Sequence, residues 1–243
     1  MDVPGAVVLV TGAGRRVGRA IALAMAQAGC DVAVHCHRST KDAATVADQI
    51  RVMGRRAVVE IADLGEPDGP MRLVEQTVMD LGRLDILVNN ASVFVKMPLD
   101  QADVAAWERI LRVNTIAPAL LARAAVPHMR RSGAGRIVNL IDILADRPIE
   151  AHGLYCASKA ALAALTRSLA LELAPEITVN GISPGIAVFP DDFDEALRQR
   201  LIDKVPLKRA GSPEQIAAVV RFLATEGDYI TGQIIAVDGG MSL

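Results

Sequence analysis

A tyrosine and a lysine stand four residues apart in a segment with helical apolar spacing. Tyr155 and Lys159 would therefore share one helix face, with their Cβ atoms about 5 to 6 Å apart. An ammonium group near a phenol stabilises the phenolate, so the pair predicts a tyrosine whose pKa is lowered from about 10 toward neutral pH. Such a tyrosine can serve as a general acid. By itself the pair is common on helix surfaces, so its meaning depends on other residues.

A glycine-rich segment opens the first predicted helix. Residues 11–18 read TGAGRRVG and directly follow a short apolar run, Val7–Val10. Glycine in such a turn lets the backbone approach a pyrophosphate closely, and the helix N-terminus supplies unpaired N–H groups for that anion. The position predicts a nucleotide-binding turn, with an ordinary structural turn as the alternative. The residues expected at the diphosphate are Gly12, Gly14, Arg15, Arg16, Val17 and Gly18.

The end of the second predicted strand indicates which cofactor is used. NAD-binding proteins usually place an acid there, for the ribose 2′-hydroxyl. This chain has His37, Arg38 and Ser39, with no acid between Asp31 and Asp42. A guanidinium and a hydroxyl suit a 2′-phosphate, so the sequence predicts NADP or NADPH, and a solvated basic loop is the alternative. Asp63 and Leu64, after the third predicted strand, are expected at the adenine edge.

Strand-like and helix-like segments alternate along the whole chain. Helical spacing is found at Gly18–Ala28, Lys41–Met53 and Ala157–Leu173, and Ser212 is a good N-cap for a late helix. The pattern predicts an α/β fold with one Rossmann-type, doubly wound domain over residues 1–243: a parallel sheet with helices on both faces. The seven predicted strands are Val7–Val10, Val32–Cys36, Val58–Ile61, Ile86–Val88, Ile137–Ile141, Thr178–Ile182 and Ile234–Val237.

Length and composition exclude several classes of protein. The chain has 243 residues, 51% of them hydrophobic, and a formal net charge of -2. This apolar content excludes disorder, and the charge gives no sign of nucleic-acid binding. Three cysteines fit neither a disulfide framework nor a metal cluster. No run reaches the length of a membrane span, and the first residues lack the features of a signal peptide, so we expect a cytoplasmic protein.

These motifs together resemble the short-chain dehydrogenase/reductase family, from about Val7 to Leu243. The resemblance implies a seven-stranded parallel sheet and assembly as a homotetramer. It implies that Tyr155 donates a proton, Lys159 holds the nicotinamide ribose, and Asn114 keeps a water in a proton relay. The catalytic segment would be 139–160, with a substrate lid over 186–206. Further residues matched to the cofactor site are Asn90 and Ala91 after the fourth strand and Pro184, Gly185 and Ile186 after the sixth.

Two departures from the family pattern carry more information than the match. The family places a serine thirteen residues before the tyrosine, and this chain has Asp142. A carboxylate there would repel the oxyanion that develops in an ordinary ketone reduction. It would suit a substrate that needs a hydrogen-bond acceptor, or one that takes a proton from a carboxylic acid of raised pKa. The second departure is Arg16, where the family commonly has glycine.

Both departures resemble the pteridine reductase branch of the family, which includes dihydromonapterin reductases. The resemblance implies a pterin ring stacked between the nicotinamide and Phe94, with Ser92 and Arg16 at its polar edge or at the cofactor phosphate. Asp142 and Tyr155 would complete the substrate site. The predicted activity is therefore NADPH-dependent hydride transfer to a pterin, dihydropterin or dihydrofolate ring, on a small molecule and with no metal.

Several alternatives remain open at this point. Phe94 could be a core aromatic, and Asp142 could cap a loop or mark a decayed enzyme. The protein could instead reduce the carbonyl of an acyl chain, a sugar or a steroid, or it could be a catalytically idle NADP-binding sensor or scaffold. Fold alone does not separate these functions.

Overall fold

One parallel sheet organises the chain. In the computed structural model, which describes residues 4–189 and 193–243, seven strands lie in the order β3-β2-β1-β4-β5-β6-β7. The order reverses between β1 and β4, which opens a crevice at the carboxyl ends of these two strands. The fold class predicted from the sequence is confirmed. The strands are β1 Val7–Val10, β2 Asp31–Cys36, β3 Ala57–Ile61, β4 Ile86–Asn89, β5 Gly135–Leu140, β6 Ile177–Pro184 and β7 Ile234–Val237.

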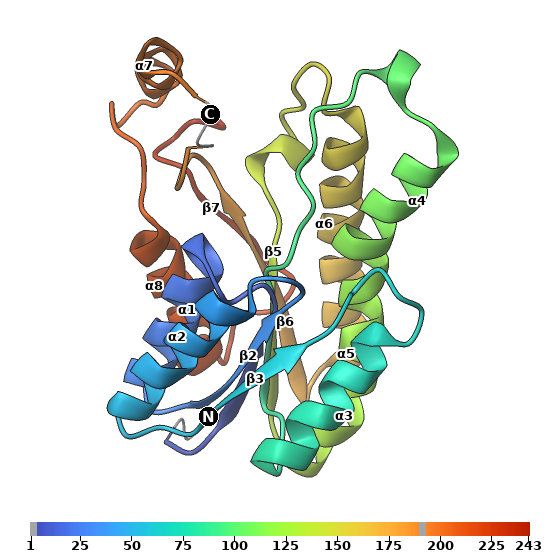
Figure 1. Cartoon of the computed structure of the whole chain (residues 1–243), viewed down its shortest axis with the longest axis vertical. Helices are drawn as coiled ribbons and strands as arrows, with labels where there is room; N and C mark the ends of the chain where they lie inside the picture. The colour runs from blue at the N-terminus through green and yellow to red at the C-terminus, as the bar shows by residue number, and fades with distance from the viewer. Residues whose placement is uncertain (1–3, 190–192) are drawn as a thin grey trace.

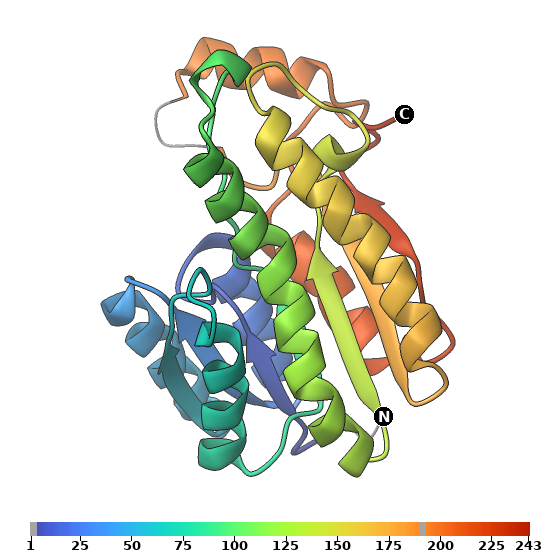
Figure 2. The ribbon, with the colours of Figure 1, turned by 90° about the vertical axis from the view of Figure 1, so that its right-hand side faces the viewer.

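Helices cover both faces of the sheet, and Figures 1 and 2 show the two layers. On one face, α1 (Arg16–Gln27), α2 (Thr40–Val52) and α8 (Pro213–Thr225) pack against alternate strand residues. The other face carries α3 (Gly69–Leu81), α5 (Ala117–Arg131) and α6 (Gly153–Leu173). The inner strands β1, β2, β4 and β5 are buried on both sides because helices cover both faces, which explains their continuous apolar runs, whereas the edge strands β3 and β7 are only partly buried.

Short elements complete the end of the molecule where the crevice opens. Helix α4 (Val104–Leu111) passes through a π-helical turn, η2 (Arg112–Ile116), into α5, and the 3-10 turn η1 (Leu99–Gln101) precedes it. A second 3-10 turn, η3 (Ile143–Ala145), follows β5. None of the described helices is both long and apolar enough to cross a membrane.

The boundaries of two helices bear on the site. Helix α8 begins as expected, because Ser212 accepts from the backbone of Gln215 while the Gln215 side chain accepts from the backbone of Ser212. Helix α6 begins earlier than the apolar spacing indicates, at Gly153, which places Tyr155 in its first turn. Within the segment 186–206, helix α7 (Glu195–Asp203) is capped by the Asp194 side chain; residues 190–192 lie outside the described part of the chain.

Candidate active site

The crevice between β1 and β4 is held by hydrogen bonds across the two strand ends. The Thr11 hydroxyl accepts from the backbone N–H groups of Asn90 and Ala91, at 2.9 and 3.0 Å. In return the Asn90 side-chain amide donates to the carbonyl of Thr11 at 2.8 Å. Asn90 and Ala91 therefore fix the glycine loop to the end of β4, on the floor of the crevice.

Two glycines make the loop tight enough to form a cradle. Gly12 has φ +64°, in the left-handed region that favours glycine. A Cβ atom on Gly18 would lie 2.2 Å from the Gly12 carbonyl oxygen and 2.5 Å from the Asn90 amide nitrogen, so a side chain cannot fit there. Helix α1 begins immediately after the loop, at Arg16, so the unpaired N–H groups of its first turn lie next to the loop. This geometry fits the diphosphate of a dinucleotide.

The two arginines of the loop behave differently. Arg15 forms an ion pair with Asp42 at the start of α2, and the sequence pattern does not predict this neutralising partner. Arg16 is exposed, lines the cavity and has φ +49°. An arginine in the left-handed region costs about 1 to 2 kcal/mol relative to glycine, which is what the family commonly has at this position. Strain of this kind is concentrated at functional sites.

The residues predicted for the 2′-phosphate and the adenine gather at one end of the crevice. The His37 imidazole lies 3.5 Å from the Asp63 carboxylate. Ser39 lies against the glycine loop, since a Cβ on Gly14 would come within 2.9 Å of its hydroxyl. Arg38 is exposed and Leu64 is buried beside Asp63. The segments after β2 and β3 thus supply an imidazole, a guanidinium and a carboxylate to this end.

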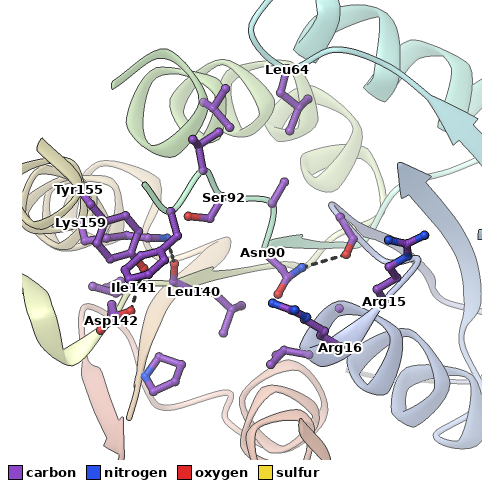
Figure 3. A pocket seen from close by; sticks show the side chains of 18 of the residues that line it. Arg15, Arg16, Leu64, Asn90, Ser92, Leu140, Ile141, Asp142, Tyr155 and Lys159 are labelled. Atoms are coloured by element: carbon purple, nitrogen blue, oxygen red, sulfur yellow. Dashed lines mark hydrogen bonds between the residues drawn. The ribbon is translucent and has the colours of Figure 1, made fainter. Parts of the chain in front are cut away.

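The opposite end holds the residues predicted to be catalytic, Tyr155, Lys159 and Asp142, which Figure 3 shows close together. The Tyr155 hydroxyl donates to Oδ2 of Asp142 at 2.7 Å. The other oxygen of Asp142, Oδ1, accepts from the Leu144 backbone at 2.9 Å and caps η3. Asp142 is therefore both a cap and a partner of the tyrosine. Lys159 is buried, donates to the Leu140 carbonyl at 2.7 Å and lies 5.8 Å from the centre of the Tyr155 ring.

Burial dominates the protonation of this cluster. The pair of Tyr155 and Lys159 predicts a lowered tyrosine pKa, and this expectation is wrong. Burial and the adjacent Asp142 carboxylate raise the pKa of Tyr155 well above its usual value. Burial also raises the pKa of Asp142, against the opposing effects of its hydrogen bonds and of Lys159. The Lys159 pKa falls to about 8 through burial, partly offset by Asp142.

Asn114 links the extended segment 92–94 to helix α6. It lies in the π-helical turn η2, and its amide nitrogen donates to Val93 and to the Ser158 hydroxyl, each at 3.0 Å. Its amide oxygen accepts from the Val93 backbone at 2.8 Å and from the Ser92 hydroxyl at 3.3 Å. The side-chain amide is thus engaged by protein groups, and it positions the 92–94 segment against α6.

Phe94 is not a core residue, so the alternative of a packing aromatic is wrong. Its side chain is 49% exposed and lines the cavity. The ring stacks on His152 with 4.9 Å between centroids and meets Tyr155 edge to face at 4.7 Å. Ser92, two residues earlier in the same extended segment, is also exposed to the cavity and lies near the Tyr155 hydroxyl, whose pKa it lowers.

A single cavity of about 540 Å³ joins the two ends. Most predicted residues line it, whereas Gly14, Arg38, Ser39 and Asn114 are not among its lining residues. Ile186 lines a neighbouring cavity beside β7, and its carbonyl accepts from Gly211 at 2.8 Å. Nothing in the sequence indicates Arg109 of α4 or Val113 of η2 as lining residues, and both reach the cavity only through tertiary packing. The other lining residues that the sequence analysis does not name individually are His35 and Val93, together with Leu140, Ile141, Ala187 and Val188, which fall within the predicted segments 139–160 and 186–206.

Known proteins resemble this chain over its whole length. Residues 12–242 match the family described as enoyl-(acyl carrier protein) reductase. Pteridine reductase 1 of Leishmania tarentolae is 37% identical, covering 98% of this chain and 96% of that protein. The 3-oxoacyl-(acyl-carrier-protein) reductase of Staphylococcus aureus is 35% identical, covering 96% of each.

Solved structures agree with the architecture. A short-chain dehydrogenase of Burkholderia cenocepacia in complex with NADP superposes with a TM-score of 0.93 at 36% identity, covering 100% of both chains. A blue fluorescent protein from a metagenomic library, in complex with NADPH, superposes with a TM-score of 0.92 at 35% identity, also covering 100% of both chains.

Proposed function

The chain belongs to the short-chain dehydrogenase/reductase family of NAD(P)-dependent oxidoreductases, and we propose that it is an NADPH-dependent reductase of pterin or dihydropterin rings. The substrate would be a pteridine, a dihydromonapterin or a dihydrofolate. The observation that carries this proposal is the 2.7 Å hydrogen bond between Tyr155 and Asp142, a carboxyl group where the family places a serine. The similarity to pteridine reductase 1 supports it.

A carboxyl group at this position favours a C=N bond over a C=O bond. Reduction of a ketone builds negative charge on oxygen, and a carboxylate next to that oxygen would raise the barrier. Reduction of a pterin C=N unit leaves a nitrogen that takes up a proton, and the ring presents N–H groups that a carboxylate can accept. Because burial raises the pKa of Asp142, its acid form is also accessible as a proton source.

We assign the glycine-loop end of the cavity to NADPH, which when bound supplies the hydride. The α1 N-terminus and Gly12, Gly14 and Gly18 would hold its diphosphate. Arg38, Ser39 and His37 would bind the 2′-phosphate, and Asp63 and Leu64 would border the adenine. The nicotinamide half would lie along Asn90, Ala91, Pro184, Gly185, Ile186 and Lys159. Solved relatives at 35 to 36% identity that contain NADPH or NADP support this assignment.

Tyr155 and Asp142 would act together in the proton transfer. In the proposed step, the tyrosine hydroxyl gives its proton to the ring nitrogen while the neighbouring ring carbon takes the hydride. The buried Lys159 ammonium offsets the charge left on the pair, and Asp142 in its acid form returns a proton to the phenolate oxygen. A buried, strongly coupled pair of this kind titrates as a pair.

The opposite wall would bind the ring. Phe94 offers an exposed aromatic surface beside Tyr155, which suits a flat heterocycle. Ser92 and the strained Arg16 would contact its polar groups or the cofactor phosphate. The segment 186–206, with helix α7, would cover this end as a lid of the single domain. From the family resemblance we also propose that the chain forms a homotetramer. It would act on a small molecule, without nucleic acid or membrane partners.

A carbonyl reductase is the second candidate. The Staphylococcus aureus relative named for 3-oxoacyl reduction is nearly as similar as the pteridine reductase, 35% against 37% identity. Similarity of sequence therefore does not choose between the two substrates.

The deciding experiment is turnover on matched substrates. NADPH oxidation is followed with dihydrobiopterin, dihydromonapterin and dihydrofolate, beside an acetoacetyl thioester, and NADH replaces NADPH as the control. We expect rapid turnover of a pterin with NADPH and little turnover of the thioester. Turnover of the thioester alone would refute the pterin proposal and leave a carbonyl reductase. Binding of NADPH without oxidation by any substrate would point to the idle sensor.

A further inference from the structure

A buried histidine connects the two halves of the proposed cofactor site. His35 is the fifth residue of β2 and is 2% exposed. Its Nδ1 lies 3.1 Å from the Gly12 backbone nitrogen, and its Nε2 lies 3.1 Å from the Ala62 carbonyl oxygen. A carbonyl can only accept, so Nε2 carries the hydrogen, and Nδ1 is left to accept from Gly12. One neutral tautomer satisfies both contacts.

The two partners belong to different parts of the site. Gly12 is the glycine with φ +64° in the diphosphate loop, and Ala62 directly precedes Asp63 and Leu64 on the adenine side. The backbone repeats the link, because the Ala13 nitrogen donates to the His35 carbonyl at 2.8 Å and the Ala62 nitrogen to the Cys36 carbonyl at 3.2 Å. The imidazole adds one side-chain hydrogen bond to each of these main-chain contacts, one on either side of β2.

We propose that His35 is a positioning residue for NADPH: its neutral imidazole fixes the distance between the diphosphate loop and the adenine turn. A side chain with one acceptor and one donor at these places would do this without touching the substrate. The role is therefore in cofactor affinity and not in the chemical step. The proposed role of His35 depends only on the dinucleotide site, so it can be tested independently of the pterin proposal.

Protonation would break the link. A doubly protonated imidazole would turn a second N–H toward the Gly12 N–H, leaving two donors opposed and a charge buried. Burial and His37 lower the pKa of His35 to about 4, while the Ala62 carbonyl and Asp63 act in the opposite direction. Other titratable groups near it are Glu60, its register partner on β3, and Arg15 and Arg16 in the loop.

Two substitutions separate positioning from folding. His35→Gln keeps one acceptor and one donor, whereas His35→Leu removes both. The matched control is Asn180→Leu. Asn180 is a 1% exposed residue of β6, outside the residues lining the cavity, and its amide also makes two bonds to backbone groups, with Ile230 at 2.7 Å and Gln233 at 3.1 Å. The control thus loses an equal number of buried bonds elsewhere in the sheet.

The first measurement is the Kd of NADP⁺ by titration calorimetry at neutral pH, which needs no substrate. We expect His35→Leu to raise the Kd about tenfold or more, since a buried backbone donor is left unpaired. His35→Gln should stay within about threefold of the wild type, and Asn180→Leu should bind normally although it melts at a lower temperature. With any substrate that is turned over, the KM for NADPH should rise in His35→Leu while kcat at saturation is retained.

The second measurement is the melting temperature against pH. In the unfolded chain His35 has the usual histidine pKa of 6.5, but in the folded chain its pKa is about 4. Stability is therefore lost as pH falls through this window. At about pH 5 the wild type should have lost about 4 °C more than His35→Gln, relative to neutral pH. Glu60 should titrate in the same way in the wild type and in His35→Gln, so its contribution cancels in the difference between their melting temperatures. Normal NADP⁺ affinity in His35→Leu, or coincident pH profiles, would overturn the proposal.

Discussion

The hydroxyl of Tyr155 donates a 2.7 Å hydrogen bond to Asp142, whose other carboxylate oxygen caps the turn that follows β5. The Asp142 carboxyl group therefore orients the proposed acid, Tyr155, and also fixes the turn η3 that begins next to Asp142. The tyrosine proton points at an acceptor of the protein before any substrate arrives. Catalysis must redirect that proton, which makes the protonation of Asp142 the central variable of the site.

Replacing Asp142 tests the proposed substrate class. Asp142→Ser should lower kcat/KM for a dihydropterin by on the order of 10²-fold, the size of a lost acid–base partner. The same change should lower turnover of the acetoacetyl thioester less, or raise it, because a hydroxyl can stabilise an oxyanion. Asp142→Asn is the control for shape, since its amide oxygen can still cap η3. Equal losses on both substrates would contradict a specialised role for the carboxyl group.

Removing the Tyr155 hydroxyl tests the proton donor. Tyr155→Phe should lower kcat by on the order of 10² to 10⁴, the usual contribution of general acid catalysis. The ring packing against Phe94 is kept, so binding of NADP⁺ should be close to normal. The comparison is made by steady-state kinetics and calorimetry on the same preparation. Near-normal turnover in this variant would exclude the tyrosine as the acid.

Lys159 predicts an alkaline limit to activity. Its pKa is lowered to about 8, and the proposed step needs its ammonium, so kcat/KM should fall as pH rises through about 8. The Asp142 carboxylate raises that pKa. Asp142→Asn should therefore move the alkaline limb to lower pH, whatever its effect on the maximal rate. A limb that stays in place, or moves to higher pH, would show that another group controls it.

The features that the sequence predicted correctly are those that depend on a local pattern of residues. Apolar runs marked the strands, glycines marked the tight loop before α1, and the spacing of Tyr155 and Lys159 placed them on one helix face. Each of these signals is carried by a few neighbouring residues. Asp142 is also readable in the sequence, as a departure from a family pattern, and the structure places its carboxylate 2.7 Å from the Tyr155 hydroxyl.

What the sequence could not give depends on burial and on distant contacts. The lowered pKa expected for Tyr155 ignored desolvation and the carboxylate that packs against it. Asp42 neutralises Arg15 from a different helix, 27 residues away. Arg109 lines the cavity because α4 packs beside α6, and His35 acquires its two partners, Gly12 and Ala62, from the loops that follow β1 and β3. No local pattern encodes these pairings.

Phe94 is expected to contribute binding and little stability. Phe94→Ala should raise the KM for a dihydropterin about threefold to tenfold, the value of one aromatic stacking contact. Because the ring is already 49% exposed, the melting temperature should change little. Phe222→Ala is the matched control, with a side chain 40% exposed on α8 and outside the lining of the cavity. A large loss of stability in Phe94→Ala without a change in KM would indicate a packing role.

Arg38 is expected to set the preference for NADPH over NADH. It is exposed just after the end of β2, where it can meet a 2′-phosphate. Arg38→Asp should raise the KM for NADPH about tenfold to a hundredfold, since a hydrogen bond to a charged group is lost and a repulsion is added. It should lower the KM for NADH, because a carboxylate can accept from the ribose 2′-hydroxyl. The readout is the ratio of kcat/KM for the two cofactors with one substrate. Equal losses with NADPH and NADH would mean that Arg38 supports the fold of the loop and does not read the phosphate.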